Sequence, residues 1–486
     1  MQKFFSLLSG KVGLLLGPLL FLIFLSLDIQ GMSWEAKAVA ASTLWIATWW
    51  ISEAIPFQVT SLLPLVLIPV TAGISIRPLA AAYGDKIIFL FLGAFIIALA
   101  MERWNLHKRI ALRIILFIGS NTQRVILGFM VATAFLSMWI SNTATTLMML
   151  PIGLAVMKQV NEFFEDKSGN FGKSLLLGVA YSASIGGLAT IVGTPTNGIF
   201  MGMNESFFQQ EITFAEWFIL CFPMVIILVY TCWVLLVKFT FKVEVHNLSG
   251  KSDVLQTEYD KLGRMSFEEK SVMAVFIFAA IAWISRSYIL VNFFPTIDDT
   301  SIGIAAAAML FIIPSRKQDE AIMTWQYAAK LPWGVLILFG GGLAIAASFQ
   351  SSGLAEYIAT GLSGLKGADS NIIIIGITSL INFLTEITSN VATATVMLPI
   401  LATLAEAINI HPYALMIAAT LASSCAFMLP VATAPNAVVF SSGLIRMKDM
   451  IRAGFLLNVI SIIIIVVFVS VILPILWDID LSTFPY

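Results

Sequence analysis

Long apolar runs separated by short polar stretches follow one another along the whole chain. Residues 12–27 and 456–476, for example, carry no charged side chain. About 20 predominantly apolar residues allow a helix to cross the hydrocarbon core of a bilayer. The pattern therefore predicts an all-α polytopic membrane protein. We expect transmembrane helices near residues 15–30, 36–54, 56–73, 86–101, 173–207, 214–238, 270–295, 301–314, 331–349, 412–443 and 450–477.

Two further apolar segments, about 125–160 and 371–410, each carry an uncharged polar motif near the middle. A polar break inside a membrane-spanning helix is tolerated where protein or a water-lined cavity satisfies the freed backbone groups. We interpret both segments as re-entrant hairpins. The prediction is therefore about eleven transmembrane helices and two hairpins.

The composition supports this class, since 59% of the residues are hydrophobic and 11% are charged. A membrane β-barrel would need short segments of alternating polarity. The first apolar run follows Lys3 and Lys11 but has no small-residue cleavage motif, so we interpret it as a span and not as a signal peptide. A net charge of −1 indicates no strongly charged partner, and we expect no nucleic acid.

Cysteine and histidine side chains show no pattern typical of a metal site. The cysteines lie inside apolar runs at no ligand-like spacing, and the histidines are scattered. We therefore expect no disulfide, no metal centre and no enzyme activity. The residues concerned are Cys221, Cys232, Cys425, His107, His246 and His411.

The distribution of basic residues predicts the orientation of the chain. With the amino terminus in the cytoplasm, all but five of the 27 lysines and arginines face the cytoplasm, as the positive-inside rule requires. The carboxyl terminus would then be external. The compact loops favour a bacterial protein, so we expect it in the plasma membrane, the inner membrane of the cell. The five external residues are Lys37, Arg77, Lys86, Arg286 and Lys366.

One long charged stretch, 242–270, divides the chain into a first half, 1–241, and a second half, 271–486. We expect this stretch to be a solvated cytoplasmic linker, with regulatory contacts as the alternative. Residues 102–117 place apolar side chains at helical spacing between basic ones, which predicts an amphipathic helix on the cytoplasmic surface.

The two halves repeat three landmarks in the same order. FLFLG at 89–93 resembles LILFG at 336–340, and SNTAT at 141–145 matches SNVAT at 389–393, which lies 248 residues later. GTPTN at 193–197 matches ATAPN at 432–436. On our topology the paired segments run in opposite directions, which is the inverted repeat of many secondary transporters. Their ion and substrate sites lie near the midplane, where the repeats meet.

The chemistry of the Ser-Asn motifs suits such a site. Asn, Ser and Thr side chains offer donors and acceptors without a charge that must be desolvated. Broken helices also expose backbone N–H groups, which suit a carboxylate, and carbonyls, which suit sodium. The alternative is that these side chains only join helices, a frequent role in membranes.

Three segments resemble the divalent anion:sodium symporter family: SMWISNTAT at 137–145, AYSASIGG at 180–187 and CAFMLPVAT at 425–433. The resemblance covers essentially the whole chain. It implies a homodimer in which each protomer has a scaffold domain and a transport domain that moves like an elevator. It also implies sodium-coupled uptake of dicarboxylates such as succinate, fumarate or malate, with citrate or sulfate as substrates of some members.

The resemblance also assigns residues. It implies one sodium site at Ser137, Ser141, Asn142 and the backbone of Gly193, and another at Thr385, Thr388, Asn390 and the backbone of Ala432. It implies substrate contacts from Asn142, Thr143, Asn390 and Thr433, with Pro195 shaping the wall. Val391 departs from the Ser-Asn-Thr form of the motif, which affects the expected substrate preference.

No lysine or arginine lies at the proposed site, so the charge of a dicarboxylate would have to be balanced by bound sodium. Sodium binding would then favour binding of the dianion. Glu53 and Glu386 are the acidic residues best placed near the membrane, either as proton acceptors or sodium-site supports or as structural hydrogen-bond acceptors. The alternatives to symport are a sodium-independent dicarboxylate exchanger of the same fold and a membrane-embedded enzyme or receptor.

Overall fold

The computed structural model describes residues 2–119, 121–164, 169–247, 253–317, 319–362 and 369–485. Within these ranges the chain is helical, and the β-structure consists of two isolated bridges, Asn121 with Asn247 and Pro314 with Ala321. The predicted all-α class is therefore confirmed.

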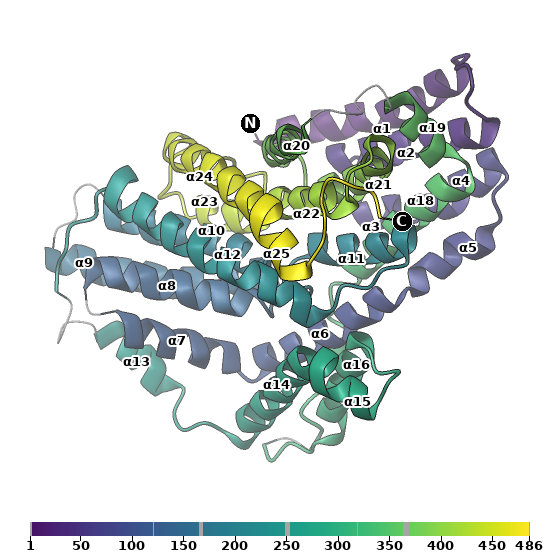
Figure 1. Cartoon of the computed structure of the whole chain (residues 1–486). Helices are drawn as coiled ribbons and strands as arrows, with labels where there is room; N and C mark the ends of the chain where they lie inside the picture. The colour runs from purple at the N-terminus through teal and green to yellow at the C-terminus, as the bar shows by residue number, and fades with distance from the viewer. Residues whose placement is uncertain are drawn as a thin grey trace.

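The first half begins with helices that match the predicted spans (Figure 1). They are α1 (Gln2–Ser26), α2 (Trp34–Ser52), α3 (Phe57–Thr60), α4 (Pro64–Ala72), α5 (Ile76–Ala81) and α6 (Lys86–Arg103). The rest of this half consists of α7 (Leu106–Ile118), α8 (Thr122–Ser137), α9 (Asn142–Phe164), α10 (Asn170–Gly187), α11 (Pro195–Phe208) and α12 (Phe214–Val234).

The described part of the connector contains one short helix, α13 (Asp253–Lys261), and the second half follows. Its first helices are α14 (Phe267–Ser285), α15 (Val291–Phe293), α16 (Asp299–Ile312), α17 (Trp325–Ala328), α18 (Trp333–Ser351) and α19 (Leu354–Leu362). Its last helices are α20 (Ser370–Leu384), α21 (Asn390–Ile408), α22 (Pro412–Ser423), α23 (Ala434–Ser441), α24 (Met447–Val467) and α25 (Leu473–Trp477).

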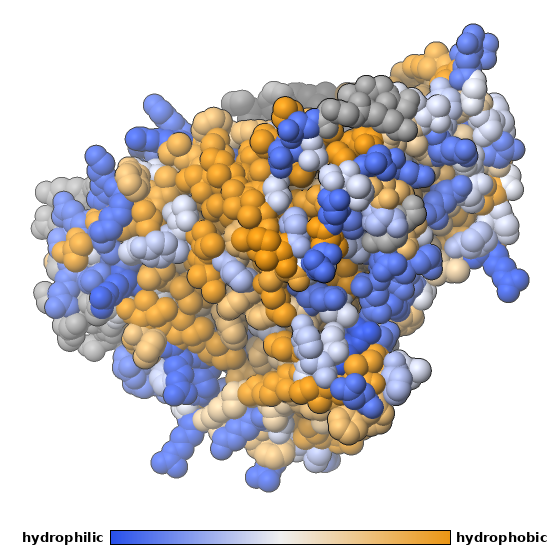
Figure 2. Space-filling model, viewed as in Figure 1, coloured by the Kyte–Doolittle hydropathy of each residue, from blue (hydrophilic) through white to orange (hydrophobic). Residues whose placement is uncertain are grey.

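Seven helical segments of the described chain are long and apolar enough to cross a membrane. Six shorter apolar helices, such as α8 and α22, accompany them. The polytopic class is confirmed, while the number of crossings and the orientation of the termini stay predictions. Figure 2 shows a broad hydrophobic face over α12 and α24, where side chains such as Ile226 and Ile463 are exposed. Lipid would cover such a face.

Both predicted hairpin segments are broken at the Ser-Asn motif, at 138–141 between α8 and α9 and at 385–389 between α20 and α21. Besides 56–73, which divides into α3 and α4, two longer predicted spans are broken. The span 173–207 divides into α10 and α11, and the span 412–443 divides into α22 and α23. In both cases proline stands in the first turn of the second helix, where its missing N–H costs nothing.

The broken helices of each half pack against helices of the other half. Helix α9 of the first half packs against α23 of the second, and α11 of the first packs against α21 of the second. Helix α10, which is buried along almost its whole length, lies against α8, α9 and α23 (Figure 1). A helix that is buried on all sides needs small or apolar side chains, and α10 has them from Ser174 to Gly187. The polar breaks of both halves are therefore held in one body.

The predicted helix forms as α7, whose Leu112 and Ile115 are buried while Phe117 is 91% exposed, and its position on the cytoplasmic surface stays a prediction. The connector is packed more closely than the expected solvated linker. The buried Arg109 of α7 donates to both carboxylate oxygens of Glu269, at 2.8 and 3.1 Å. It also donates to the carbonyls of Gly263 and Leu262, at 2.9 and 3.1 Å. The end of the connector is thus fixed to α7.

Candidate functional site

The first half gathers three oxygens at the break between α8 and α9. The Ser137 hydroxyl lies 2.5 Å from Asn142 Oδ1 and 2.7 Å from the Ala183 carbonyl oxygen. We call Ser137 Oγ, Asn142 Oδ1 and Ala183 O the first oxygen cluster. A hydroxyl has one proton and can satisfy only one of two acceptors at a time. The cluster therefore has spare acceptor capacity, which a cation can use.

The second half repeats this arrangement at the break between α20 and α21. The Thr385 hydroxyl lies 2.7 Å from Asn390 Oδ1 and 2.8 Å from the Ser423 carbonyl oxygen. These three oxygens form the second oxygen cluster. Ser137 and Thr385 are both fully buried. The sequence predicted that each hydroxyl shares a site with its asparagine, and the structure brings each pair together.

Because Gly187 has no side chain, the backbone carbonyl of Gly193 can lie next to Asn142 of the first oxygen cluster. A Cβ added at Gly187 would lie 2.9 Å from Asn142 Oδ1 and 3.0 Å from Gly193 O. Both oxygens, and Asn142 Nδ2 at 3.3 Å, therefore lie close to the same point, which glycine leaves open. This places the backbone of Gly193 beside Asn142, as the resemblance implied.

Not every residue assigned to sodium points into a cluster. The Ser141 hydroxyl accepts from Ala144 N at 3.3 Å, at the start of α9. Thr388 Oγ1 lies 2.9 Å from Leu384 O and 2.6 Å from Thr393 Oγ1. The N–H of Ala432 donates to Leu429 O at 3.3 Å, within the break between α22 and α23. Sodium binding stays a prediction for these three residues, as it does for the members of both clusters.

The residues assigned to the substrate lie at helix starts. Asn142 and Thr143 begin α9, Asn390 begins α21, and Pro195 begins α11. Thr433 precedes α23, and its hydroxyl accepts from Asn436 N at 3.2 Å. Free N–H groups at helix starts favour an anion. The breaks thus combine oxygens suited to cations with N–H groups suited to carboxylates. Val391 is half-buried.

Two asparagines that the sequence did not assign hold the broken helices in place. Asn197 donates to Thr190 O at 2.8 Å and to the carbonyls of Gly187 and Leu188 at 3.3 Å. Asn436 donates to Ala426 O and Leu429 O, both at 3.1 Å. Both end the third repeated landmark, GTPTN and ATAPN. Their shared position in the repeat was the signal that could have identified them.

The two candidate carboxylates have different surroundings. Glu386 is buried in the second break, and backbone N–H groups of the α22–α23 loop donate to it. Glu53 is exposed and ends α2 in a left-handed conformation, with φ of 48°. Among the described residues, no group of three or more His, Cys, Asp and Glu side chains could hold a metal ion.

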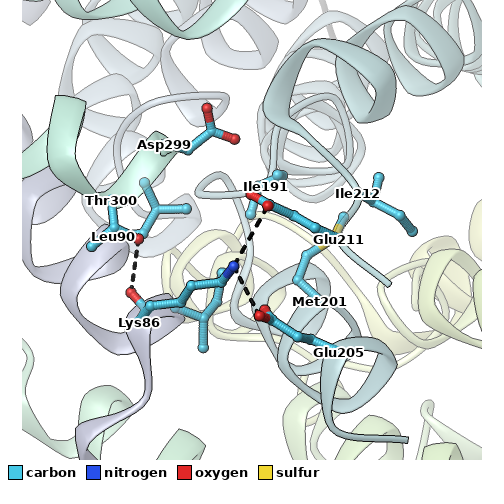
Figure 3. A pocket seen from close by; sticks show the side chains of 10 residues that line it. Lys86, Leu90, Ile191, Met201, Glu205, Glu211, Ile212, Asp299 and Thr300 are labelled. Carbon is cyan, nitrogen blue, oxygen red and sulfur yellow. Dashed lines mark hydrogen bonds and ion pairs between the residues drawn. The ribbon is translucent and has the colours of Figure 1, made fainter. Parts of the chain in front are cut away.

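A separate charged network surrounds a cavity of about 30 Å³ (Figure 3). Lys86 of α6 lies 2.9 Å from Glu205 of α11 and 3.6 Å from Glu211, which lies between α11 and α12. Arg286 lies 2.8 Å from the same Glu211 and 3.3 Å from Asp299 of α16. Burial opposes ionisation of Glu211, but Arg286 and Lys86 outweigh it and lower the pKa of that carboxyl. This cavity has room for about one water molecule, which excludes a dicarboxylate.

An all-helical membrane protein whose two halves each contribute a broken hairpin and a broken helix, with the hairpin helix of each half packed against the broken helix of the other, has the architecture of a secondary transporter. A family-wide sequence profile described as the sodium:sulfate symporter transmembrane region matches residues 13–478. The chain belongs to this family, which confirms the resemblance noted above. The protein is therefore an integral membrane transporter and not an enzyme.

Relatives over nearly the full length carry a more specific description. A protein of Staphylococcus saprophyticus named sodium-dependent dicarboxylate transporter SdcS is 46% identical over 481 residues, which cover 97% of this chain and 93% of that protein. A Staphylococcus aureus protein of the same name is 47% identical, with 97% and 92% covered.

Two solved structures share the fold. The YdaH transporter of Alcanivorax borkumensis has a TM-score of 0.57 at 13% identity and covers 96% of this chain and 98% of its own. MtrF of Neisseria gonorrhoeae has a TM-score of 0.57 at 12% identity, with 83% and 85% covered. At these identities the likeness concerns the fold alone.

Proposed function

We propose that the protein is a sodium-coupled symporter that takes up C4-dicarboxylates such as succinate, fumarate or malate across a bacterial plasma membrane. The observation that carries this proposal is the pair of oxygen clusters, each with one hydroxyl proton among three oxygens. Relatives at 46% and 47% identity are named as sodium-dependent dicarboxylate transporters, which supports the same ion and substrate class.

In this proposal each oxygen cluster binds a sodium ion, and the dicarboxylate lies between the clusters at the starts of α9 and α21. Asn142, Thr143, Asn390 and Thr433 would contact its carboxylates. Among the described residues, no lysine or arginine hydrogen-bonds a member of either cluster. The bound ions would therefore supply the positive charge that the dianion needs, and ion and substrate affinity would rise together.

We further propose an elevator movement of α8–α12 and α20–α24 against a scaffold of the remaining spans. The contacts between the broken helices of both halves support one moving body. Its border with the scaffold is aromatic and ionic. Trp139 in the first break contacts Phe276 of α14 edge-on at 4.9 Å, and the Lys86 network joins α6 to α11. A homodimer, a cytoplasmic amino terminus and an external carboxyl terminus complete the proposal.

Uptake of radiolabelled succinate into proteoliposomes tests this function, with an inward sodium gradient or with potassium in its place. Half of the vesicles would be loaded with unlabelled succinate. Accumulation that needs sodium but no internal substrate is the expected result. Uptake that needs internal dicarboxylate and is independent of sodium would instead establish an exchanger.

A further inference from the structure

The carboxylate of Glu386 is the most densely hydrogen-bonded side chain near the two clusters. It directly follows Thr385 of the second oxygen cluster and is 3% exposed. Its Oε1 accepts from Phe427 N at 2.7 Å, from Met428 N at 2.9 Å and from Asn458 Nδ2 at 2.7 Å. Its Oε2 accepts from Met428 N at 3.1 Å and from Leu429 N at 3.0 Å.

This pattern favours a charged carboxylate. Four of the five bonds come from backbone N–H groups, which can only donate, so a proton on Oε2 would displace the Met428 or Leu429 donor. Among the described residues, none of the ion pairs involves Glu386. A buried carboxylate without a basic partner is costly unless hydrogen bonds or a nearby cation stabilise it. The N–H donors supply the hydrogen bonds, and a sodium ion in the adjacent second oxygen cluster would supply the nearby cation.

Glu386 connects three elements that the second oxygen cluster depends on. The residue itself lies in the α20–α21 break, Phe427 to Leu429 lie in the α22–α23 break, and Asn458 belongs to α24. Asn436 holds the same α22–α23 break from its other side, through Ala426 O and Leu429 O. The carboxylate therefore fixes the two breaks relative to each other.

The first half has no carboxylate at the corresponding position. Ser137 corresponds to Thr385 and Asn142 to Asn390, so Met138 occupies the position of Glu386. There the hairpin break is joined to the α10–α11 break by a neutral bond, from Thr190 Oγ1 to Met138 O at 2.5 Å. The two oxygen clusters consist of similar atoms, but only the second is followed directly in the chain by a carboxylate.

We propose that Glu386 is a positioning residue for the sodium ion of the second oxygen cluster and makes this the tighter of the two sodium sites. The inference rests on the proposed function. The carboxylate holds the breaks in the arrangement that the ion needs, so less ordering remains to be done on binding. Its negative charge also attracts the cation through an interior where screening is weak.

Sodium-induced thermal stabilisation of the purified full-length protein tests this inference. Sodium would be titrated against potassium at constant ionic strength, and the midpoint sodium concentration of the stabilisation would be measured. Glu386→Gln replaces one acceptor oxygen by an NH2 group that faces Met428 and Leu429 N–H. We expect the midpoint to rise at least tenfold. Met138→Leu is the matched control in the other hairpin, and its midpoint should stay within twofold of wild type.

Two further variants keep the test decisive if Glu386→Gln does not fold. Glu386→Asp retains the charge and should recover part of the sodium affinity. Asn458→Ala removes one donor without changing the carboxylate and should raise the midpoint severalfold. In uptake assays of the folded variants, the half-saturating sodium concentration should rise more than the succinate KM, which a general loss of stability would not produce.

The possible failures are distinguishable. A wild-type protein that sodium does not stabilise would overturn the proposed sodium coupling and this inference with it. A normal wild-type response with unchanged midpoints in the folded Glu386 variants would overturn this inference alone. Equal shifts in Glu386→Gln and Met138→Leu would also overturn it, because the two hairpins would then not differ.

Discussion

Replacement of Gly187 by alanine should raise the sodium concentration that half-saturates uptake, because it obstructs a point beside the first oxygen cluster. The added Cβ would lie 2.9 Å from Asn142 Oδ1 and 3.0 Å from Gly193 O. Ordinary contact between a carbon and another heavy atom begins at about 3.5 Å. The oxygens must therefore move by several tenths of an ångström, and the space for a sodium ion at this point would be reduced.

The size of the effect follows from the cost of overpacking. Extra methyl groups in a well-packed interior typically cost about 1–3 kcal/mol. If that cost falls on the sodium-bound arrangement, sodium affinity decreases about 5- to 150-fold. Gly187 ends α10, and the gain in helix propensity from alanine, about 1 kcal/mol, offsets part of any loss in overall stability.

Gly153 provides a matched control in α9. A Cβ at this position would be 3.5 Å from Leu175 Cδ2 and 3.7 Å from Phe129 Cε1, which is ordinary van der Waals contact. Gly153→Ala should leave sodium dependence unchanged. Both variants would be reconstituted at equal protein density, and the initial rate of succinate uptake would be measured against sodium concentration.

The reasoning fails if folded Gly187→Ala protein has a half-saturating sodium concentration within twofold of wild type. It also fails if Gly153→Ala is impaired to the same degree, because the effect would then be a general one of helix packing. A large shift in Gly187→Ala alone would place the ion at the point that Asn142 and Gly193 share.

The other predictions concern the substrate site, the charged network and pH. Asn142→Ala and Asn390→Ala should each abolish uptake and still yield folded dimer in detergent, and near-normal transport by either would contradict the site assignment. Val391→Thr should change the preference among dicarboxylates and citrate more than the sodium dependence, as competition assays would show. Lys86→Glu should slow transport, and combining it with Glu205→Lys should restore the rate, because the 2.9 Å ion pair would be re-formed with reversed charges. Unchanged transport by Lys86→Glu would show that this pair does not lie between the scaffold and the moving domain. Burial lowers the pKa of His411 to about 4, against about 6.5 when unfolded. Protonation therefore favours the unfolded chain, and thermal stability should decrease as the pH falls from about 6.5 towards 4. His411→Asn, which keeps an acceptor for Tyr413 N, should flatten this part of the profile.

The sequence predicted those features of the site that depend on repeated local motifs. Ser137 with Asn142 and Thr385 with Asn390 lie five residues apart across a helix break, so their contact follows from the hairpin alone. The partner carbonyls of Ala183 and Ser423 belong to other helices, and no local pattern identifies them. The roles of Asn197 and Asn436 depend on backbone groups that are exposed only because the helices are broken.

Ion pairs between residues far apart in the chain could not be predicted from local sequence patterns either. Lys86, Glu205 and Arg286 look like isolated charges at the ends of apolar runs. Only the packing of α6, α11 and the turn that follows α14 brings them together, with Glu211 between Lys86 and Arg286. Arg109 looked like one more cationic residue of a surface helix, but its side chain is buried against Glu269. Charge patterns therefore indicated orientation, while the pairing of charges required the fold.

The exchange of contacts between the halves also has a consequence for biosynthesis. Helix α9 is complete about 270 residues before α23, the helix that packs against it, begins to be made. At about 5–20 residues per second, this separation corresponds to roughly 14 to 54 seconds of translation. Throughout that interval α9 lacks its native neighbour from the second half. The native packing of the first hairpin is therefore completed only near the end of synthesis, so membrane insertion and final folding are separate events in time.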